Sequence, residues 1–300
     1  MSTESTPLAQ TFEAHRPWLL SIAYRMLGSA VEAEDIVQEA CLHFLEASPD
    51  EVRAPKAFLA TIVTRLSINH LKSARVRRER YPGTWLPEPV FTAQADDPES
   101  RGEQNESVRM AFLVVLESLT PAERAVLLLR DVFAYEYSEI ATIVGKSVFN
   151  CRQILHRARR RVSEGRPSFR LSRPRENSLL DRFVAATTGG KMDELVSLLA
   201  LDVEVWSDGG GRVAAARVPV LGRDRVVQFL FGSLRKLVPH DVTIRIAEIN
   251  AQRAVVNYRN GLPYSALVLE GDDDGMIRRI FIVVNPDKLQ ALAGASRMVL

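Results

Sequence analysis

Apolar residues recur every three or four positions through most of the first 80 residues, which is the pattern of helices with one buried face. The apolar-rich stretch 17–27 ends at Gly28, a residue typical of helix C-termini. Ser29 then predicts an N-cap for a helix that runs to about Leu45. A further helix is predicted over Lys56–Arg80, with a proline-containing loop at Ala47–Pro55 before it. The positions of the Ser29-capped helix that should face a core are Ile36, Val37, Ala40, Cys41, Phe44 and Leu45.

Residues 81–105 break this pattern and predict a linker, because they combine four prolines with a run of acidic residues. Within the linker, Trp85–Pro89 places a large aromatic residue and a leucine in otherwise polar chain. We therefore expect this segment to pack against a neighbouring domain.

Helical periodicity returns at 106–165. Thr120, followed by proline and then by Glu123, predicts a capping box that opens a helix. After it come the helical segment 137–144, a turn at Gly145, a new cap at Ser147 and a long basic segment. This order of elements is typical of a helix-turn-helix.

Beyond residue 178 the pattern changes again and predicts an α+β domain over 178–300, with a curved antiparallel sheet. Helices are predicted at 179–188, 191–199 and 223–237. Alternating or β-branched runs separated by glycine-rich or Asn-Gly turns predict strands. The predicted strands are 203–206, 213–218, 242–249, 254–258, 264–269 and 277–284.

Composition indicates the cell compartment and shows that charge is segregated along the chain. The 300 residues are 46% hydrophobic and 25% charged, and no apolar run is long enough to cross a membrane. With two cysteines and an N-terminus unlike a signal peptide, the sequence predicts a cytoplasmic protein without disulfides or a metal site. The net charge of +2 hides an acidic segment at 1–50, two basic blocks at 56–80 and 152–175, and a near-neutral remainder.

The second basic block carries the clearest candidate chemistry. On a helix that begins after Ser147, five apolar positions form one stripe: Val148, Cys151, Leu155, Ala158 and Val162. The remaining side chains must point outward, and Asn, Gln and Arg at such positions can pair with base edges in the major groove while trailing arginines contact phosphates. The candidate DNA-binding residues are Ser147, Phe149, Asn150, Arg152, Gln153, His156, Arg157 and Arg160, with Arg159 beside them.

The first basic block is a weaker candidate for a surface that follows phosphates or holds unpaired bases, and a merely solvated face is an equal alternative. Its candidate residues are Lys56, Phe58, Arg65, Asn69, Lys72, Arg75, Arg77 and Arg78.

Three segments together resemble bacterial extracytoplasmic-function (ECF) sigma factors: 33–40 (AEDIVQEA), 57–62 (AFLATI) and the helix-turn-helix 137–159. The resemblance implies that residues 8–80 recognise and melt the −10 promoter element and that 106–165 read the −35 element. It also implies core RNA polymerase as a partner through its β and β′ subunits. The residues implied to contact the β′ clamp helices are Glu34, Asp35, Gln38 and Glu39. The loop Ala47–Pro55 matches the family's base-capturing loop, whereas Arg65 replaces an asparagine common in the family.

A narrower resemblance covers the linker and the C-terminal domain. Trp85–Pro89, Asp208–Arg212 and Asn285–Leu289 are similar to the motifs of the subgroup with a fused SnoaL-like domain, which in that subgroup modulates activity in place of a separate anti-sigma protein. We expect this domain to pack on the first helical domain and on the linker at Trp85. The implied regulatory contacts are Trp85, Leu86, Asp208, Gly209, Gly210, Gly211, Asn285, Pro286, Asp287 and Lys288.

Catalysis is the least supported interpretation. Acid–base chemistry needs converging titratable groups, and the C-terminal domain offers one histidine, His240, with Asp208, Asp224 and Asp241. We expect neither an enzyme nor a cofactor, while a pocket in this domain leaves room for a small ligand. Two alternatives stay open: a ligand-responsive helix-turn-helix regulator, and a SnoaL-like isomerase or cyclase with a DNA-binding appendage.

Overall fold

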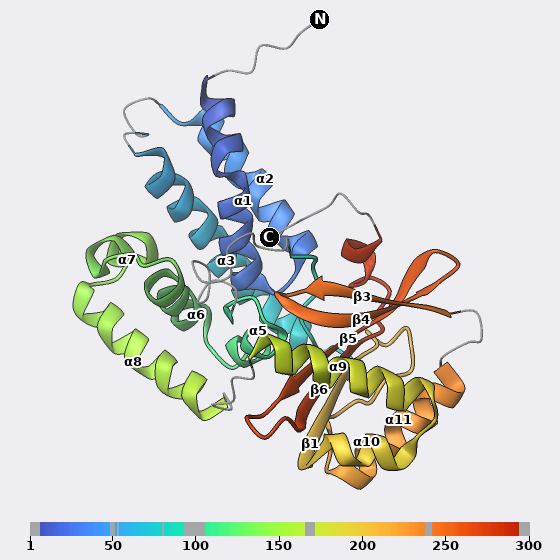
Figure 1. Ribbon diagram of the computed structural model, residues 1–300. Helices are drawn as coiled ribbons and strands as arrows, with labels where there is room; N and C mark the ends of the chain where they lie inside the picture. The colour runs from blue at the N-terminus through green and yellow to red at the C-terminus, as the bar shows by residue number, and fades with distance from the viewer. Residues whose placement is uncertain are drawn as a thin grey trace, which may run out of the picture.

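The N-terminal part of the chain consists of three long helices that lie side by side, α1 (Pro7–Leu27), α2 (Ala30–Glu46) and α3 (Pro55–Glu79) (Figure 1). The computed structural model describes residues 7–48, 52, 54–79, 81–92, 106–165, 172–237 and 242–293. The predicted cap is confirmed, since the Ser29 side chain accepts a hydrogen bond from the Glu32 amide at 3.1 Å. Helix α1 begins ten residues before the apolar stretch; half of these ten residues are polar, so the apolar pattern did not mark them.

One detail of the predicted core of α2 is wrong. Leu45 is 42% exposed, and Cys41 is half-buried, whereas Ile36, Val37 and Phe44 are buried as expected. Phe44 is the last buried residue of α2, and Leu45 lies outside the buried stripe.

The second helical module contains the predicted helix-turn-helix. Its elements are α5 (Met110–Leu116), α6 (Pro121–Leu127), a π-helical turn η1 (Leu128–Val132), α7 (Tyr137–Val144) and α8 (Val148–Gly165). The capping box is confirmed: Thr120 Oγ1 accepts from the Glu123 amide at 3.3 Å, and the Thr120 amide donates to Glu123 Oε2 at 3.0 Å. Gly145 ends α7 with a φ of +64°, a conformation that residues with a Cβ resist.

The two helical modules share one continuous hydrophobic core, which extends from Phe12 in α1 to Val162 in α8. Trp18 meets Phe133 edge to face with ring centroids 6.3 Å apart, and Arg25 lies over the same Phe133 ring at 5.6 Å. The Arg124 guanidinium donates to the Met26 carbonyl at 2.7 Å. The modules are therefore packed against each other rather than held apart by the linker.

The C-terminal domain is α+β, as predicted. Its helices are α9 (Arg173–Thr188), α10 (Met192–Leu198) and α11 (Arg223–Leu237), with a short 3-10 helix η2 (Gln290–Leu292). The strands are β1 (Leu199–Asp208), β2 (Val220–Leu221), β3 (Val242–Ile249), β4 (Gln252–Arg259), β5 (Leu262–Gly271) and β6 (Ile277–Val283). They form one sheet in the order β2-β1-β6-β5-β4-β3, with β2 and β3 at its two edges.

Two expectations about the sheet need correction. It is mixed rather than antiparallel, because β1 and β6 run parallel while the other neighbouring pairs are antiparallel. The predicted strand 213–218 is irregular, and only Val220–Leu221 pairs with β1. In that segment the Ala216 amide donates to the Ser207 hydroxyl at 2.9 Å instead of joining a ladder.

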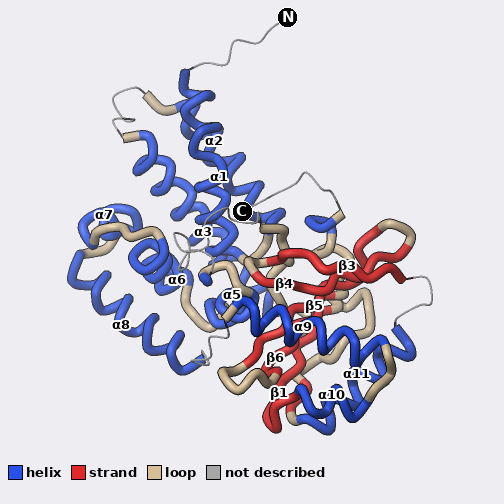
Figure 2. Tube along the Cα trace, viewed as in Figure 1, coloured by secondary structure: helices blue, strands red, loops and turns tan. Residues whose placement is uncertain are grey.

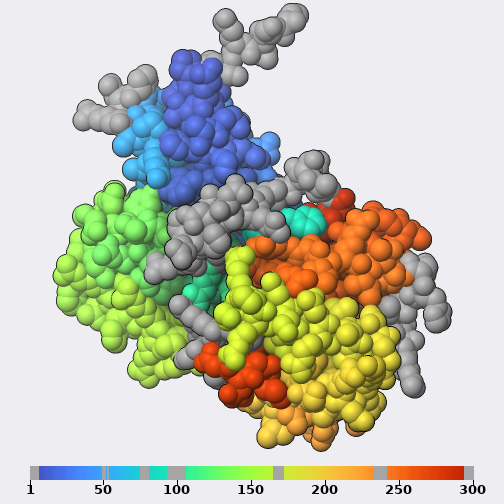
Figure 3. Space-filling model, viewed as in Figure 1, coloured from blue at the N-terminus to red at the C-terminus, as the bar shows by residue number. Residues whose placement is uncertain are grey.

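Both faces of the sheet are covered (Figures 1 and 2). Helices α9, α10 and α11 cover one face, where Phe183, Leu195 and Val226 pack against Ile280. The other face packs against parts of the chain far away in sequence, namely Leu86 of the linker and Met110 of α5. Figure 3 shows the resulting contact between the N-terminal helices, the helix-turn-helix module and the C-terminal domain. Within the described part of the chain, no helix has the length and apolarity of a membrane span.

Candidate nucleic-acid interface and interdomain junction

Helix α8 buries one face and exposes the other. Cys151, Leu155 and Ala158 are at most 1% exposed, while Val148, at the first position of the predicted stripe, is 36% exposed. Ile154 is also buried, which the stripe did not include. All the outward candidates are exposed: Ser147, Phe149, Asn150, Arg152, Gln153, His156, Arg157, Arg159 and Arg160. The helix thus presents a basic face with amide and aromatic side chains at the surface of the molecule.

Acidic side chains orient the arginines of α8. The carboxylate of Glu123, buried under the helix, pairs with Arg161 at 2.7 Å and with Arg157 at 3.8 Å. Asp131 accepts two hydrogen bonds from Arg159, at 2.6 and 3.0 Å, and this bonding raises the pKa of the Arg159 guanidinium. The sequence marked Glu123 only as a capping residue and did not single out Asp131, because both pairings join residues 28 or more positions apart.

The first basic block is divided between core and surface. Lys56 lies over the Trp18 ring at 4.9 Å, and Phe58 packs against Phe44 with centroids 6.2 Å apart, which places Phe58 at the core. Asn69 and Lys72 are exposed on α3. The side chains of Arg75, Arg77 and Arg78, and part of the loop 47–55, lie outside the described residues.

The acidic candidates on α2 form an exposed face. Asp35, Gln38 and Glu39 are exposed, and Glu34 is half-buried beside Arg16, with which it forms an ion pair. Three exposed apolar residues continue this face at helical spacing, Val31, Leu42 and Leu45; the sequence analysis assigned none of them to this face and placed Leu45 in the core. An acidic face interrupted by apolar side chains is suited to a protein partner.

A buried aspartate joins the linker to the C-terminal domain. Asp208, at the end of β1, is 0% exposed. Its Oδ1 accepts from the Tyr81 hydroxyl at 2.6 Å and the Gly210 amide at 2.9 Å. Its Oδ2 accepts from the Leu86 amide at 2.9 Å and from Lys288 Nζ at 2.7 Å. Four donors from three segments therefore satisfy one carboxylate.

Lys288 completes this junction. Its ammonium group lies 3.9 Å from the Trp85 ring centroid and 5.1 Å from that of Tyr81, a geometry that favours cation–π attraction. It also donates to the Leu86 carbonyl. Burial raises the pKa of the Tyr81 hydroxyl, and the hydrogen bond to Asp208 raises it further. At the surface of the junction, Pro286 and Asp287 are exposed, and Asp287 pairs with Arg212 at 2.8 Å.

The glycines of the 209–211 loop allow Asn285 and the linker residue Pro82 to lie close to the loop backbone. A Cβ at Gly210 would lie 2.3 Å from Asn285 Nδ2, and one at Gly211 would lie 2.6 Å from Pro82 Cγ. Both residues also have positive φ, +60° and +72°. At Gly209 a Cβ would meet the Val213 carbonyl oxygen at 2.1 Å.

The same linker contacts the start of α2. The Glu88 carboxylate accepts from the Ser29 hydroxyl at 2.7 Å and from the amides of Ala30 and Val31 at 2.7 and 3.3 Å, so it caps the helix from outside. Burial raises the pKa of Glu88, although these hydrogen bonds act in the opposite direction. Gly28 leaves room for Trp85, whose Cη2 would lie 2.7 Å from a Cβ at that position.

Asn250, in the β3–β4 turn, ties the C-terminal domain to both helical modules, and the sequence analysis did not select it. Its Nδ2 donates to the Tyr24 hydroxyl at 2.6 Å and to the Val108 carbonyl at 2.8 Å. Its backbone amide donates to the Val90 carbonyl at 3.0 Å. A φ of +52° marks it as a turn residue, but no local pattern indicates its distant partners.

Comparison with known proteins agrees with this arrangement. Residues 11–77 match the Sigma-70 region 2 family, and residues 109–162 match the Sigma-70 region 4 family. Over 295 residues the chain is 39% identical to the ECF RNA polymerase sigma factor SigJ of Mycobacterium tuberculosis, covering 92% of this chain and 91% of that protein. This chain belongs to the ECF sigma factor family.

The similarity extends over the whole sigma factor, including its C-terminal domain. This chain is also 32% identical to the probable ECF RNA polymerase sigma factor SigI of M. tuberculosis over 294 residues, which cover 97% of both chains. The crystal structure of M. tuberculosis SigJ superposes with a TM-score of 0.74 at 34% identity, covering 94% of this chain and 98% of that one. The predicted fold class is confirmed as two helical modules followed by an α+β domain.

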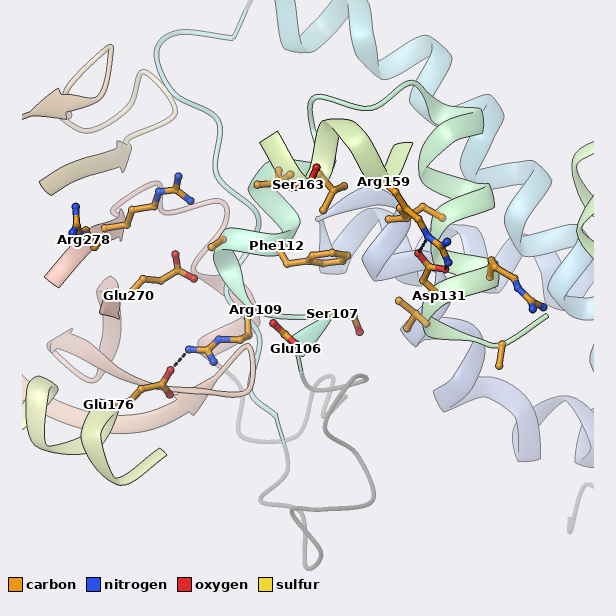
Figure 4. Close-up of a pocket in the computed structure, with 18 of the residues that line it drawn as sticks. Glu106, Ser107, Arg109, Phe112, Asp131, Arg159, Ser163, Glu176, Glu270 and Arg278 are labelled. Atoms are coloured by element: carbon orange, nitrogen blue, oxygen red, sulfur yellow. Dashed lines mark hydrogen bonds and ion pairs between the residues drawn. The ribbon is translucent and has the colours of Figure 1, made fainter. Parts of the chain in front are cut away.

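A cavity of about 900 Å³ lies where the helix-turn-helix module of the sigma factor meets α9 and the β5–β6 hairpin. Figure 4 shows Phe112 projecting into it, with Glu270 and Arg278 on the side of the sheet. Charged groups on its wall are paired across it or with neighbours, as Arg109 is with Glu176 and Arg159 with Asp131. The wall therefore carries no excess charge of one sign that would select a ligand.

Of the four residues considered for catalysis, the structure describes Asp208 and Asp224. All four donors to Asp208 belong to the junction described above, and Asp224 is exposed on the first turn of α11. His240 and Asp241 lie outside the described residues.

Proposed function

We propose that this sigma factor binds core RNA polymerase through the exposed face of α2, reads −35 DNA through α8 and engages −10 DNA through α3. Membership of the ECF family supports promoter-directed transcription initiation. The observation that carries the assignment of α8 is its division, from Cys151 to Val162, into a buried apolar stripe and an exposed face, with Asn150, Arg152 and Gln153 all exposed.

We also propose that the C-terminal domain regulates initiation through contacts rather than catalysis, by holding the two helical modules together. The −35 and −10 elements are about 25 base pairs apart, which is about 85 Å of duplex at 3.4 Å per base pair. Modules that share a hydrophobic core cannot reach both elements at once, so initiation requires them to separate. Separation also requires the linker between the modules to extend, and the junction at Asp208 and the Glu88 cap oppose this by holding the linker on the C-terminal domain and on α2.

Run-off transcription with core polymerase tests both parts of this proposal. Transcription from a cognate promoter by the wild-type chain, and its loss in Arg152→Ala, would support the promoter-reading role. Asp208→Ala removes the acceptor at the junction and should raise transcription, because less free energy then opposes opening. Asp224→Ala, an exposed aspartate in the same domain, is the matched control and should leave transcription unchanged. Equal activities of the two aspartate variants would contradict the regulatory part alone.

A further inference from the structure

Arg65 of α3 binds the helix-turn-helix module. Its Nε donates to the Ile143 carbonyl at 2.9 Å, and its Nη2 donates to the Thr142 carbonyl at 2.8 Å. These carbonyls belong to the last turn of α7, where helix carbonyls have no partner within the helix and carry the negative end of its dipole. An arginine from one module thus caps the C-terminus of a helix in the other.

The same arginine lies on the face of α3 that we assign to −10 DNA. Asn69 follows it by one turn and Lys72 by about two, and all three residues are exposed. The Nε and Nη2 groups form one edge of the guanidinium fork, which is the edge that binds a phosphate or a base in bidentate fashion. While that edge donates to α7, it is not available to DNA.

The other proposed interfaces are not blocked in this way. The candidate residues of α8, such as Asn150 and Gln153, are exposed in the closed arrangement, and so are Asp35 and Glu39 on α2. The closed molecule therefore presents its polymerase face and its −35 face, while the −10 face is tied to α7.

We propose that α7 and −10 promoter DNA compete for Arg65, so that engagement of the −10 element releases the helix-turn-helix module. This inference rests on the proposed function, since it takes α3 as the −10 surface. By linkage, whatever free energy closure gains from Arg65 is subtracted from −10 binding. The faces proposed for polymerase and −35 DNA are exposed in the closed form, whereas −10 DNA selects the open form.

The distance between the modules tests this competition. Fluorescent probes at Glu46, at the end of α2, and at Lys146, in the turn of the helix-turn-helix, report separation in the full chain; both positions are exposed. Incorporating the probes as non-natural amino acids leaves Cys41 and Cys151 unmodified. The distance distribution is measured without DNA and with a single-stranded −10 oligonucleotide, for the wild type, Arg65→Ala, Arg65→Lys and Lys72→Ala.

Without DNA, Arg65→Ala should raise the ratio of open to closed molecules about five- to tenfold, since two hydrogen bonds from a charged donor are lost at a partly exposed site. Arg65→Lys should give an intermediate ratio, because an ammonium group cannot span both carbonyls as a fork does. Lys72→Ala should leave the ratio unchanged and weaken oligonucleotide binding. In the wild type, the oligonucleotide should shift the distribution towards the open form.

Two results would overturn the inference: an Arg65→Ala distribution equal to the wild type without DNA, or oligonucleotide binding to the wild type with no change in distance. Failure of the proposed function has a different signature, since it would leave the wild type inactive in run-off transcription whatever the distance measurement shows.

Discussion

The ion pair between Lys288 and Asp208 allows a quantitative test of the junction. Both side chains are almost fully buried, at 7% and 0% exposure. Lys288→Met keeps much of the volume of the side chain but leaves the Asp208 carboxylate without its counter-ion. Removing one partner of a buried pair typically costs about 3–5 kcal/mol. Asp208 would still accept hydrogen bonds from Tyr81, Leu86 and Gly210, so we expect the lower end, about 3 kcal/mol.

Hydrogen exchange at the Leu86 amide measures this change directly, because that amide donates to Asp208. A loss of about 3 kcal/mol corresponds to exchange roughly a hundredfold faster, at 1.4 kcal/mol per factor of ten. The double variant Asp208→Asn, Lys288→Met buries no charge at this point. Its loss of free energy protecting the Leu86 amide should therefore be smaller than the sum of the losses in the two single variants.

Arg212→Ala is the matched control, since it breaks the nearby pair with Asp287, whose side chains are 64% and 52% exposed. An exposed pair contributes at most about 1 kcal/mol, so Leu86 protection should change little. If Lys288→Met exchanged at the same rate as Arg212→Ala, the ion pair would not hold the linker and the assignment of the junction would fail.

Three further predictions follow from the geometry. Burial raises the pKa of Glu88, so the contribution of this residue to stability is full at acid pH and is lost as pH rises through the raised pKa. The free energy of unfolding in urea, measured for the wild type and for Glu88→Gln, should therefore change in favour of Glu88→Gln as pH rises. A difference between the two free energies that stays constant with pH would contradict this prediction. Gly210→Ala should lower the midpoint of thermal unfolding far more than Gly145→Ala. Both glycines have positive φ, but only at Gly210 would the added Cβ meet a neighbour, Asn285 Nδ2, at 2.3 Å. In promoter binding, Arg152→Ala should cost about 1–3 kcal/mol and change base preference, whereas Arg160→Ala should weaken all sequences equally and reduce the salt slope by about 1; equal losses on every sequence for both would refute the assigned face of α8.

Local signals predicted most of the fold. The Ser29 cap, the Thr120 capping box and the Gly145 turn depend on residues within a few positions of each other, and all three are present as expected. The strand predicted at 213–218 failed because its backbone bonds to a side chain nine residues away. The parallel pairing of β1 with β6 was also missed, since alternation along a strand does not indicate the direction of its neighbour.

The candidate site shows the same limit. The exposed face of α8 follows from helical periodicity alone. The partners of Arg65 and Asn250 do not, because they lie 77 or more positions away and consist mainly of backbone carbonyls, which leave no mark in the sequence. The linker motif was recognisable by its unusual Trp85, but only the structure shows that Glu88 caps α2.

The spacing of the two linker anchors has a mechanical consequence. Leu86 is packed into the core of the sheet, and Glu88, two residues later, caps the start of α2. Two residues of extended chain span about 7 Å, so the sheet and the start of α2 cannot move apart by more than that while both anchors hold. One of the two contacts must therefore break before the C-terminal domain can move away from α2, and a single broken anchor is enough to free that movement at this point of the linker.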